Sequence, residues 1–596
     1  MKRIHLIILS IILFVQAAFS QYQPKSEHLK QPEKYIDYVK SNMEFWKSHA
    51  FDATYGGFYS SISQNGSILN TNQKSLIVQT RHGYGFTRAF MLTGDTTYLN
   101  YAKSALNFLY SYGWDKTYGG WYCFAQRNGA LDNRTGWNPN AKKWGFQQHY
   151  ALLGIIANFE ATQDSVAKTW IDKGMNSLNT HMWDSRTNYK GYYSDGTLNW
   201  GTMTGKGFTP TVDAITTNAE LNYLVTKDAA YKSRLLELAD IITQRFIPLM
   251  DNVNVKVLYP ETYNADWVTD FSNTEVSIGH FIKTAWCLGR AYLCDTTHTE
   301  YKKAADKILQ QVLNWSNGSY TLWDNVNGGS YMDMYINTGT PGGTDGTYKD
   351  YWTLEQGFTG PMINYYITGN EDYLQLADEA TDFFMNYQVD KTYGEIFSQV
   401  SSNGLTVMNS VKGDDFKASY HSTEMGYYGY LYSKLYYLNQ PATLYYKFDK
   451  KKTARSIALQ PIPMPESNLK IQSVELNGVS FNQFNADTRT LNIAANEGGV
   501  FKVTFLPIGR SVSGLANYNH SDISVYPGIV SSEITISSES SIQNIRILEL
   551  SGRLVREIKS GLINEKINVS DLHSGIYVVS VTTVSGTVAH KKFIKK

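Results

Sequence analysis

WDKTYGGWY, residues 114–122, has the pattern of a tight turn between two short aromatic strands, and the chain repeats it. FDATYGGFY at 51–59 is nearly the same sequence, and VDKTYGEIF at 389–397 is a partial copy. Looser copies are WDSRTNYKGYY at 183–193, MDNVNVKVLY at 250–259 and WDNVNGGSY at 323–331. The markers Asp52, Asp115, Asp184, Asp251, Asp324 and Asp390 follow one another at spacings of 63, 69, 67, 73 and 66 residues. A near-constant period of this length indicates stacked supersecondary units.

Two helices are predicted between successive hairpins. After the first hairpin, residues 79–92 are rich in aromatic residues at helical spacing, and residues 96–113 carry apolar residues on one helical face. Gly94-Asp95 separates the two helices, with Asp95 or Thr96 as the N-cap. Six such units predict an all-α (α/α)6 toroid at 25–440 with the β-hairpins at one rim. Closure removes the apolar ends that the alternative, an open solenoid, has to cap.

The sequence changes character after about residue 440. Short alternating runs divided by Asn-Gly, Pro and Asp turns predict a β-sandwich accessory domain at 441–510. A further all-β segment is predicted at 520–596. The expected architecture is therefore an all-α toroid followed by two small all-β domains.

The N-terminus predicts export. Lys2 and Arg3 precede an apolar run, and Ala18-Phe19-Ser20 is a small-residue cleavage site, so residues 1–20 have the pattern of a secretory signal peptide. The apolar stretches after residue 20 are shorter than a membrane-spanning helix needs, so we expect no membrane span. We expect the mature chain to be secreted or attached to the cell surface.

Composition narrows the class of ligand. The net charge is +1, from 54 basic and 53 acidic residues, and no basic stripe predicts a nucleic-acid partner. Cys123, Cys287 and Cys294 are too few for a disulfide framework, and the Cys/His spacings predict neither a metal site nor a cofactor. Tyr, Phe and Trp number 44, 26 and 13, an excess that suits stacking on sugar rings.

The C-terminal segment carries a recognisable set of short motifs. They are Val525-Tyr526-Pro527, Leu550-Ser551-Gly552-Arg553, Leu572-His573-Ser574-Gly575-Ile576-Tyr577 and the basic ending KKFIKK. The segment resembles the type A sorting domain of the type IX secretion system of Bacteroidota, which usually has Pro-Asn-Pro where this chain has Pro527-Gly528-Ile529. The resemblance implies that the type IX machinery is a partner and that the protein is secreted or surface-attached.

The toroid also resembles a known family. The matching residues, in order, are Gly56-Gly57-Phe58, Gln79-Thr80-Arg81, Gly279-His280-Phe281-Ile282 with Trp286, Tyr351-Trp352-Thr353-Leu354-Glu355 and Lys417-Ala418-Ser419-Tyr420-His421. They are similar to the N-acylglucosamine 2-epimerase superfamily, which includes cellobiose 2-epimerases and aldose–ketose isomerases. The resemblance implies proton transfer at C2 of a mono- or oligosaccharide. His280 and His421 are the implied catalytic pair, since imidazoles exchange protons near neutral pH.

Several residues near this pair are candidates for binding the substrate. The resemblance makes Arg81 a substrate-binding residue, while Trp352 either stacks on a sugar ring or packs in the wall. Glu355 either holds a hydroxyl group, orients a histidine or forms a structural pair. The family's substrate-binding histidine on the third inner helix is missing, and Asn218 and Glu220 are the candidates there.

Two departures concern charge. The family has Glu three residues after its first histidine and usually Arg three after its second, whereas this chain has Lys283 and Glu424. Each lies one helical turn from its histidine. The exchange predicts an ion pair with its ends swapped, so we expect Lys283 and Glu424 to meet or to share a ligand.

Two other classes of function stay open on the same toroid. An inverting glycosidase needs two carboxylates, for which Asp213, Glu220, Glu355 and Glu424 are available. A polysaccharide lyase would use a base and a cation, for which Arg81, Lys283 and His421 are available. The third class is a non-catalytic surface glycan-binding protein, which would not need the histidine pair.

Overall fold

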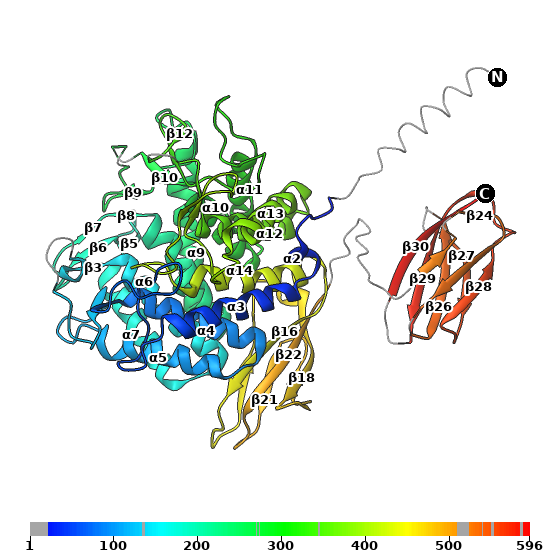
Figure 1. Ribbon diagram of the computed structural model, residues 1–596, viewed down its shortest axis with the longest axis horizontal. Helices are drawn as coiled ribbons and strands as arrows, with labels where there is room; N and C mark the ends of the chain where they lie inside the picture. The colour runs from blue at the N-terminus through cyan, green and yellow to red at the C-terminus, as the bar shows by residue number, and fades with distance from the viewer. Residues whose placement is uncertain are drawn as a thin grey trace. The chain divides into compact units, whose positions relative to one another are not determined.

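The computed structural model describes residues 22–596, except 134–137, 270, 273, 344–345, 509–523, 528, 539, 550–552 and 585–587 (Figure 1). The chain forms two compact units, Met1–Arg510 and Ser511–Lys596. The predicted signal peptide at 1–20 lies outside the described residues. In the described part of the chain, every helix is too short or too polar to cross a membrane.

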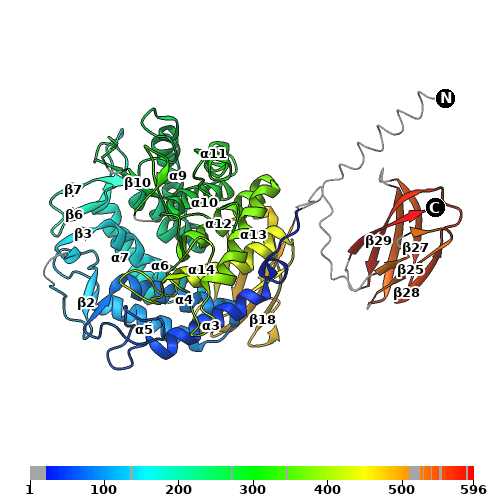
Figure 2. The same ribbon diagram turned by 45° about the horizontal axis from the view of Figure 1, so that its top comes forward.

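The first unit is built from helices in two concentric layers. Figure 2 shows α4, α6, α10, α12 and α14 towards the middle, with α3, α5, α11 and α13 outside them. The inner layer is α4 (Leu76–Thr93), α6 (Gly145–Thr162), η3–η4–α8 (Thr209–Asp213, Ile215–Ala219 and Glu220–Thr226), α10 (Ile278–Cys294), α12 (Tyr351–Thr368) and α14 (Ser419–Tyr432). The outer layer is α3 (Glu33–His49), α5 (Thr97–Tyr112), α7 (Ser165–Ser177), α9 (Ala229–Ile241), α11 (Thr299–Asn314) and α13 (Glu371–Phe383).

Burial distinguishes the two layers. All residues of α14, and all of α4 except the last, are buried. By contrast, α5 buries one face, made of Tyr98, Ala102, Ala105, Leu106, Phe108 and Leu109. A helix that is apolar all round belongs inside a protein, and an amphipathic one covers it.

The first and last helices are in contact. The last inner helix, α14, packs on both α3 and α4. A Cβ atom added at Gly426 would lie 2.2 Å from Val39, and one at Gly85 would lie 2.3 Å from Ser419 Oγ, so glycines allow this close approach. The array is therefore closed and is not an open solenoid.

Short strands lead into the inner helices at one rim. They are β1 (Gln73–Ser75), β3 (Lys142–Trp144), β8 (Lys206–Gly207), β10 (Glu275–Ser277) and β13 (Lys349–Asp350). Their partners are β2 (Phe124–Gln126), β6 (Asp195–Thr197), β9 (Thr262–Tyr263), β11 (Asp333–Tyr335) and β14 (Gln399–Val400). The strands β7 (Met203–Thr204), β12 (Thr340–Pro341) and β15 (Val407–Asn409) extend three of these sheets. The first residues of the inner helices therefore lie at the rim.

Five of the six marker aspartates make the same buried contact. Each forms an ion pair with a lysine 22 to 28 residues further on, four of which lie just before the next inner helix. The pairs are Asp52–Lys74 (2.9 Å), Asp115–Lys143 (2.7 Å), Asp184–Lys206 (2.7 Å), Asp324–Lys349 (3.0 Å) and Asp390–Lys412 (2.9 Å). The aspartates were predicted from the repeat in the sequence, whereas the lysines, four of which recur at the same place before an inner helix, were not.

The fourth copy differs, and the hairpin predicted at 250–259 is wrong. Asp251 ends the 3₁₀ helix η6 (Ile247–Asp251), is exposed and pairs with Lys307 at 2.6 Å. The position of the buried lysine is taken by Val276 in β10. The segment that follows Asp251 forms no hairpin, and it contributes Glu261 to the site described below.

The strands after α14 form two sheets on the end of the helical layers. One sheet contains β16 (Ala442–Phe448), β22 (Gly499–Pro507), β18 (Leu469–Leu476) and β19 (Val479–Ser480); the other contains β17 (Arg455–Ala458), β21 (Thr490–Ile493) and β20 (Phe484–Asn485). Alternate residues of β16 are buried, and β16 packs on α4 and α6. The two sheets and the helices share one hydrophobic core. The segment predicted as an accessory domain at 441–510 is thus part of the first compact unit.

Gly94 tests this contact between helix and sheet. It ends α4 in the left-handed region (φ 75°), and an added Cβ would lie 2.7 Å from the Tyr445 ring. Gly369 ends α12 with the same φ of about 76° and has no atom within 4 Å of its Cβ position. We expect Gly369→Ala to lower the free energy of unfolding by about 1–2 kcal/mol from backbone strain alone. Gly94→Ala should lose about 1–3 kcal/mol more from overpacking, and equal losses in chemical denaturation would contradict the packing.

The second unit has its own apolar core. Its sheets are β23–β25–β28 (Ser524–Tyr526, Glu533–Ser537 and Asn564–Asn568) and β24–β30–β29–β26–β27 (Ile529–Val530, Val588–Lys595, Gly575–Thr583, Ile542–Glu549 and Leu554–Lys559). Ile534, Ile545, Ile547, Val579 and Phe593 are fully buried within it. Of the matched motifs, Gly575-Ile576-Tyr577 begins β29, whereas Leu550-Ser551-Gly552 lies outside the described residues.

Candidate active site

The predicted site residues come from the first turns of the inner helices. His280 and His421 are each the third residue of their helix, α10 and α14, while Trp352 and Glu355 lie in the first turns of α12. The Trp352 ring has its centroid 4.9 Å from that of His280 and 6.4 Å from that of His421. The structure therefore brings both histidines to the same tryptophan.

His280 is held by Glu261, a carboxylate that was not among the predicted site residues. Its Nδ1 lies 3.0 and 3.1 Å from the two carboxylate oxygens of Glu261, and its ring stacks on Phe208 at 4.0 Å. Because a carboxylate only accepts, Nδ1 carries the proton in this contact. Burial lowers the pKa of His280, but the Glu261 charge and hydrogen bond outweigh it and raise the pKa above its ordinary value.

His421 lies in the opposite electrostatic environment. Its side chain is 8% exposed, against 32% for His280. Burial, and then the charges of Arg81 and Lys283, hold the pKa of His421 well below its ordinary value. Nδ1 lies 3.3 Å from Glu355 Oε2, so a neutral ring that donates there leaves Nε2 unprotonated. His280 is therefore the more readily protonated of the two histidines, and His421 is held neutral.

Arg81 lies near His421 and comes from α4. Its guanidinium stacks on the rings of Tyr150 (4.7 Å) and Tyr420 (5.3 Å), and Nη1 donates to the Phe416 carbonyl oxygen at 2.5 Å. Nε is buried and has no acceptor among the described residues. The cation is thus fixed in place beside His421, whose pKa it lowers.

The prediction that Lys283 and Glu424 form an ion pair is wrong. Lys283 Nζ lies 2.7 Å from Asp213 Oδ1, in a buried ion pair, and 3.3 Å from the Tyr150 hydroxyl. Glu424 instead accepts a hydrogen bond from the Tyr84 hydroxyl at 3.3 Å and lies 4.0 Å from His421. The partner of Lys283 was missed because it lies on the third inner helix, 70 residues earlier in the chain.

The other two candidates on the third inner helix are engaged in the helix packing. Asn218 donates to the ring of His149 at 3.0 Å, and Glu220 pairs with Arg290 at 3.3 Å. Both are fully buried, and among the described residues no hydrogen bond or ion pair joins them to His280 or His421. The structure therefore does not bring Asn218 and Glu220 to the histidine pair.

Glu355 supports His421. Its Oε1 accepts from Thr359 Oγ1 at 2.7 Å, and Gln356 Nε2 donates to Oε2. Burial, and then the Glu424 charge, raise the pKa of Glu355 well above its ordinary value. Of the roles expected for Glu355, the contact with His421 Nδ1 fits that of orienting a histidine.

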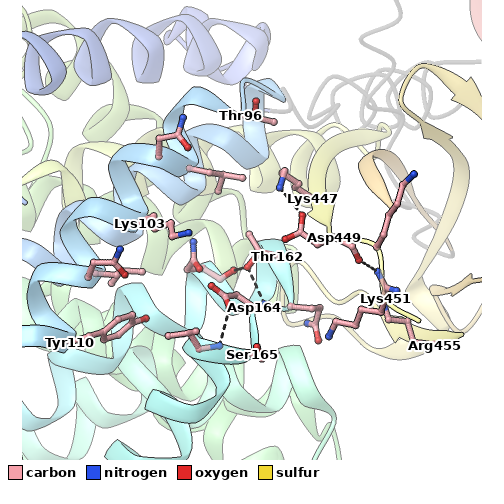
Figure 3. A pocket seen from close by; sticks show the side chains of 18 residues that line it. Thr96, Lys103, Tyr110, Thr162, Asp164, Ser165, Lys447, Asp449, Lys451 and Arg455 are labelled. Carbon is pink, nitrogen blue, oxygen red and sulfur yellow. Dashed lines mark hydrogen bonds and ion pairs between the residues drawn. The ribbon is translucent and has the colours of Figure 1, made fainter. Parts of the chain in front are cut away.

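A pocket of about 560 Å³ lies at the other end of the inner helices (Figure 3). It is lined by residues of α5, the start of α7 and the segment around β16 and β17, among them Lys103, Asp164, Lys447, Lys451 and Arg455. Some of its charged groups serve local structure: Asp164 caps α7, and Lys447 pairs with Asp449 at 2.8 Å. It contains none of the predicted site residues.

Comparisons with known proteins identify the families that the two units of the chain resemble. Residues 57–424 match the N-acylglucosamine 2-epimerase (GlcNAc 2-epimerase) family, and residues 524–596 match the secretion system C-terminal sorting domain. Similar proteins include cellobiose 2-epimerase from Bacteroides fragilis, 22% identical over 64% of this chain and 94% of that protein. D-mannose isomerase from Marinomonas mediterranea is 23% identical over 65% of this chain and 93% of that protein.

Solved structures show the same fold. A D-mannose isomerase matches with a TM-score of 0.59 at 20% identity, over 68% of this chain and 99% of that chain. A cellobiose 2-epimerase from Spirochaeta thermophila matches with a TM-score of 0.57 at 21% identity, over 68% and 97%. Both resemblances drawn from sequence motifs are confirmed, and the sorting domain associates the chain with secretion or the cell surface. The helical part of this chain belongs to the N-acylglucosamine 2-epimerase family.

Proposed function

We propose that this protein is a sugar 2-epimerase or aldose–ketose isomerase that transfers the C2 proton of a mono- or oligosaccharide through His280 and His421. The observation that carries the proposal is the pair of histidines that both lie close to Trp352, one with a raised and one with a lowered pKa. Acid–base catalysis needs one group of each kind. The relatives, a cellobiose 2-epimerase and a D-mannose isomerase, catalyse reactions that agree with it.

The proposed reaction starts from the open-chain sugar. Nε2 of His421 removes the C2 proton, and the electron pair moves onto the C1 carbonyl oxygen to give an enediolate. Arg81 stabilises the negative charge on that oxygen. His280 returns a proton to the other face of C2, which re-forms the C1 carbonyl and epimerises the sugar, or to C1, in which case the C2 hydroxyl proton moves to the C1 oxygen and the ketose forms. Glu355 and Glu261 keep Nδ1 of each ring protonated, so that Nε2 faces the substrate.

The proposal also assigns the protein to the outside of the cell, on the basis of its N-terminal and C-terminal segments. The signal peptide at 1–20 would direct the chain across the inner membrane, and the tail at 524–596 would direct it through the type IX machinery. The enzyme would then act on sugars outside the cell or at its surface.

One assay separates the proposed reaction from its alternatives. We would incubate the purified protein with cellobiose, glucose, mannose and uronate polymers and identify the products by chromatography and NMR. The proposal predicts a C2 epimer or a ketose. An unsaturated uronate product would indicate a lyase, and new reducing ends alone would indicate a hydrolase; either would contradict the proposal.

The pH dependence should report on Glu261. Since His280 acts as the acid, activity should fall as the pH rises through its raised pKa. Glu261→Gln removes the charge that raises this pKa, so the alkaline limb of kcat/KM should move to lower pH. Glu300→Gln is the matched control. Glu300 also contacts a histidine, His298, at 2.8 Å, but this pair lies at the start of the outer helix α11. An unchanged limb in Glu261→Gln would contradict the assignment of His280 as the acid.

A further inference from the structure

Among the described residues, two buried carboxylates of the inner layer form no ion pair with a lysine or an arginine. Three other buried acids are paired with cations: Asp213 with Lys283 (2.7 Å), Glu220 with Arg290 (3.3 Å) and Glu160 with Arg88 (2.7 Å). Glu355 and Glu424 are 0% and 4% exposed, and both lie beside the imidazole of His421. Burying two carboxylates beside a neutral imidazole is costly unless a proton or a cation joins them.

The three side chains converge on one point. His421 Nδ1 lies 3.3 Å from Glu355 Oε2 and 4.0 Å from Glu424 Oε2, and the three ligand atoms all lie within 4.8 Å of one another. A tetrahedral zinc ion with bonds of about 2.0–2.2 Å separates its ligand atoms by about 3.4 Å. Glu355 and His421 already have this spacing, and Glu424 would need to approach His421 by about half an ångström.

Glu424 has a free oxygen at this point. Oε1 accepts from Tyr84, whereas Oε2 is buried and accepts no hydrogen bond within the described residues. Glu355 is held by Thr359 and Gln356, and Gln356 in turn accepts from Trp286 Nε1 at 2.5 Å. Supporting hydrogen bonds of this kind orient the ligands of protein metal sites.

We propose that Glu355, His421 and Glu424 form a binding site for a divalent transition-metal ion, with zinc as the ion that one imidazole and two carboxylates fit best. Three protein ligands leave the fourth position open to water or a sugar oxygen. The Cys/His spacings of the sequence did not predict this site, because the ligands come from α12 and α14. The site depends on Glu424, at the position where the family usually has an arginine.

Metal binding has a consequence for the proposed function, on which this step rests. In the metal-free protein the His421 proton is on Nδ1 and the lone pair is on Nε2. Zinc takes Nδ1, the proton moves to Nε2, and any proton on either carboxyl group is released to solvent. A bound ion therefore removes the base, so zinc should inhibit C2 proton transfer, and a chelator should restore it.

The test measures binding without any sugar. A second group of ligand atoms, from Asp240, His298 and Glu300, lies on the outer helices, so the His298→Gln variant serves as the background. We expect the metal-free protein to bind one Zn²⁺ per chain by calorimetry and Co²⁺ to give the visible absorption of a tetrahedral site. Glu424→Gln should weaken binding at least about tenfold. Glu261→Gln, which removes a carboxylate beside the other histidine, should leave the affinity unchanged.

The outcomes separate the two proposals. Absence of stoichiometric binding, or equal affinity in a Glu424→Gln protein whose thermal unfolding shows that it is folded, would overturn the metal site. C2 proton exchange is measured separately, in the presence of EDTA. Zinc binding without C2 proton exchange would support the metal site and contradict the proposed function. C2 proton exchange without zinc binding would support the proposed function and contradict the metal site.

Discussion

Replacing His421 with asparagine is expected to lower kcat for C2 proton transfer by about 10²–10⁴-fold, the usual contribution of a positioned general base. The physical reason is the low pKa of His421, which keeps Nε2 unprotonated at neutral pH. Asparagine is smaller and keeps a polar group towards Glu355, so the fold should survive. The measurement is the initial rate of epimer or ketose formation, with thermal unfolding as the check on folding.

A second histidine provides the control. His149 is fully buried on α6, and burial lowers its pKa to about 3, so it stays neutral at working pH. Its ring accepts from Asn218 and packs on Tyr192 at 4.8 Å. His149→Asn should therefore lower the melting temperature and leave the rate of the folded enzyme within a few-fold. A His421 variant that kept its rate would contradict the assignment of His421 as the base.

Replacing Lys283 with methionine is expected to lower the free energy of unfolding by about 3–5 kcal/mol, because it leaves the buried Asp213 carboxylate unpaired. The pair is 3% and 4% exposed, so solvent cannot compensate. The variant Lys283→Met/Asp213→Leu removes both charges and should lose less than the sum of the single variants. Chemical denaturation at neutral pH measures all three.

The same experiment distinguishes the two partners considered for Lys283. If Lys283 pairs with Asp213, Lys283→Met and Glu424→Gln should be close to additive. The opposite result would be strong coupling of Lys283→Met with Glu424→Gln and additivity of Lys283→Met with Asp213→Leu in the free energy of unfolding. It would support the ion pair between Lys283 and Glu424 that was expected from the sequence.

The repeat made much of the fold predictable. Aspartate markers at spacings of 63 to 73 residues located the helix pairs, because each unit must place its apolar faces on its neighbours. The buried lysines were missed because an exposed lysine and a buried one look alike in a sequence. The hairpin predicted in the fourth unit was wrong because Met250-Asp251 resembles the start of the other hairpins. The sequence signal that distinguishes this unit is Val276, which stands where the other units have the buried lysine.

The candidate site was predictable where it lies at the starts of helices. His280, His421, Trp352 and Glu355 fall at corresponding places in three units, so the repeat brings them to one rim. Glu261 could not be found in this way, because it lies in the irregular segment before α10. Asn218 and Glu220 were chosen by their position in the chain, but the turn of the helix directs them to His149 and Arg290.

Deuterium incorporation at C2 tests the central claim most directly. The metal-free protein is incubated with cellobiose and with mannose in D₂O, and the recovered sugar is analysed by NMR and mass spectrometry. We predict deuterium at C2 in the epimer and in recovered substrate, and its loss in both His421→Asn and His280→Asn. An epimer or ketose formed without deuterium from solvent, or deuterium incorporation that persists in both variants, would contradict proton transfer through this histidine pair.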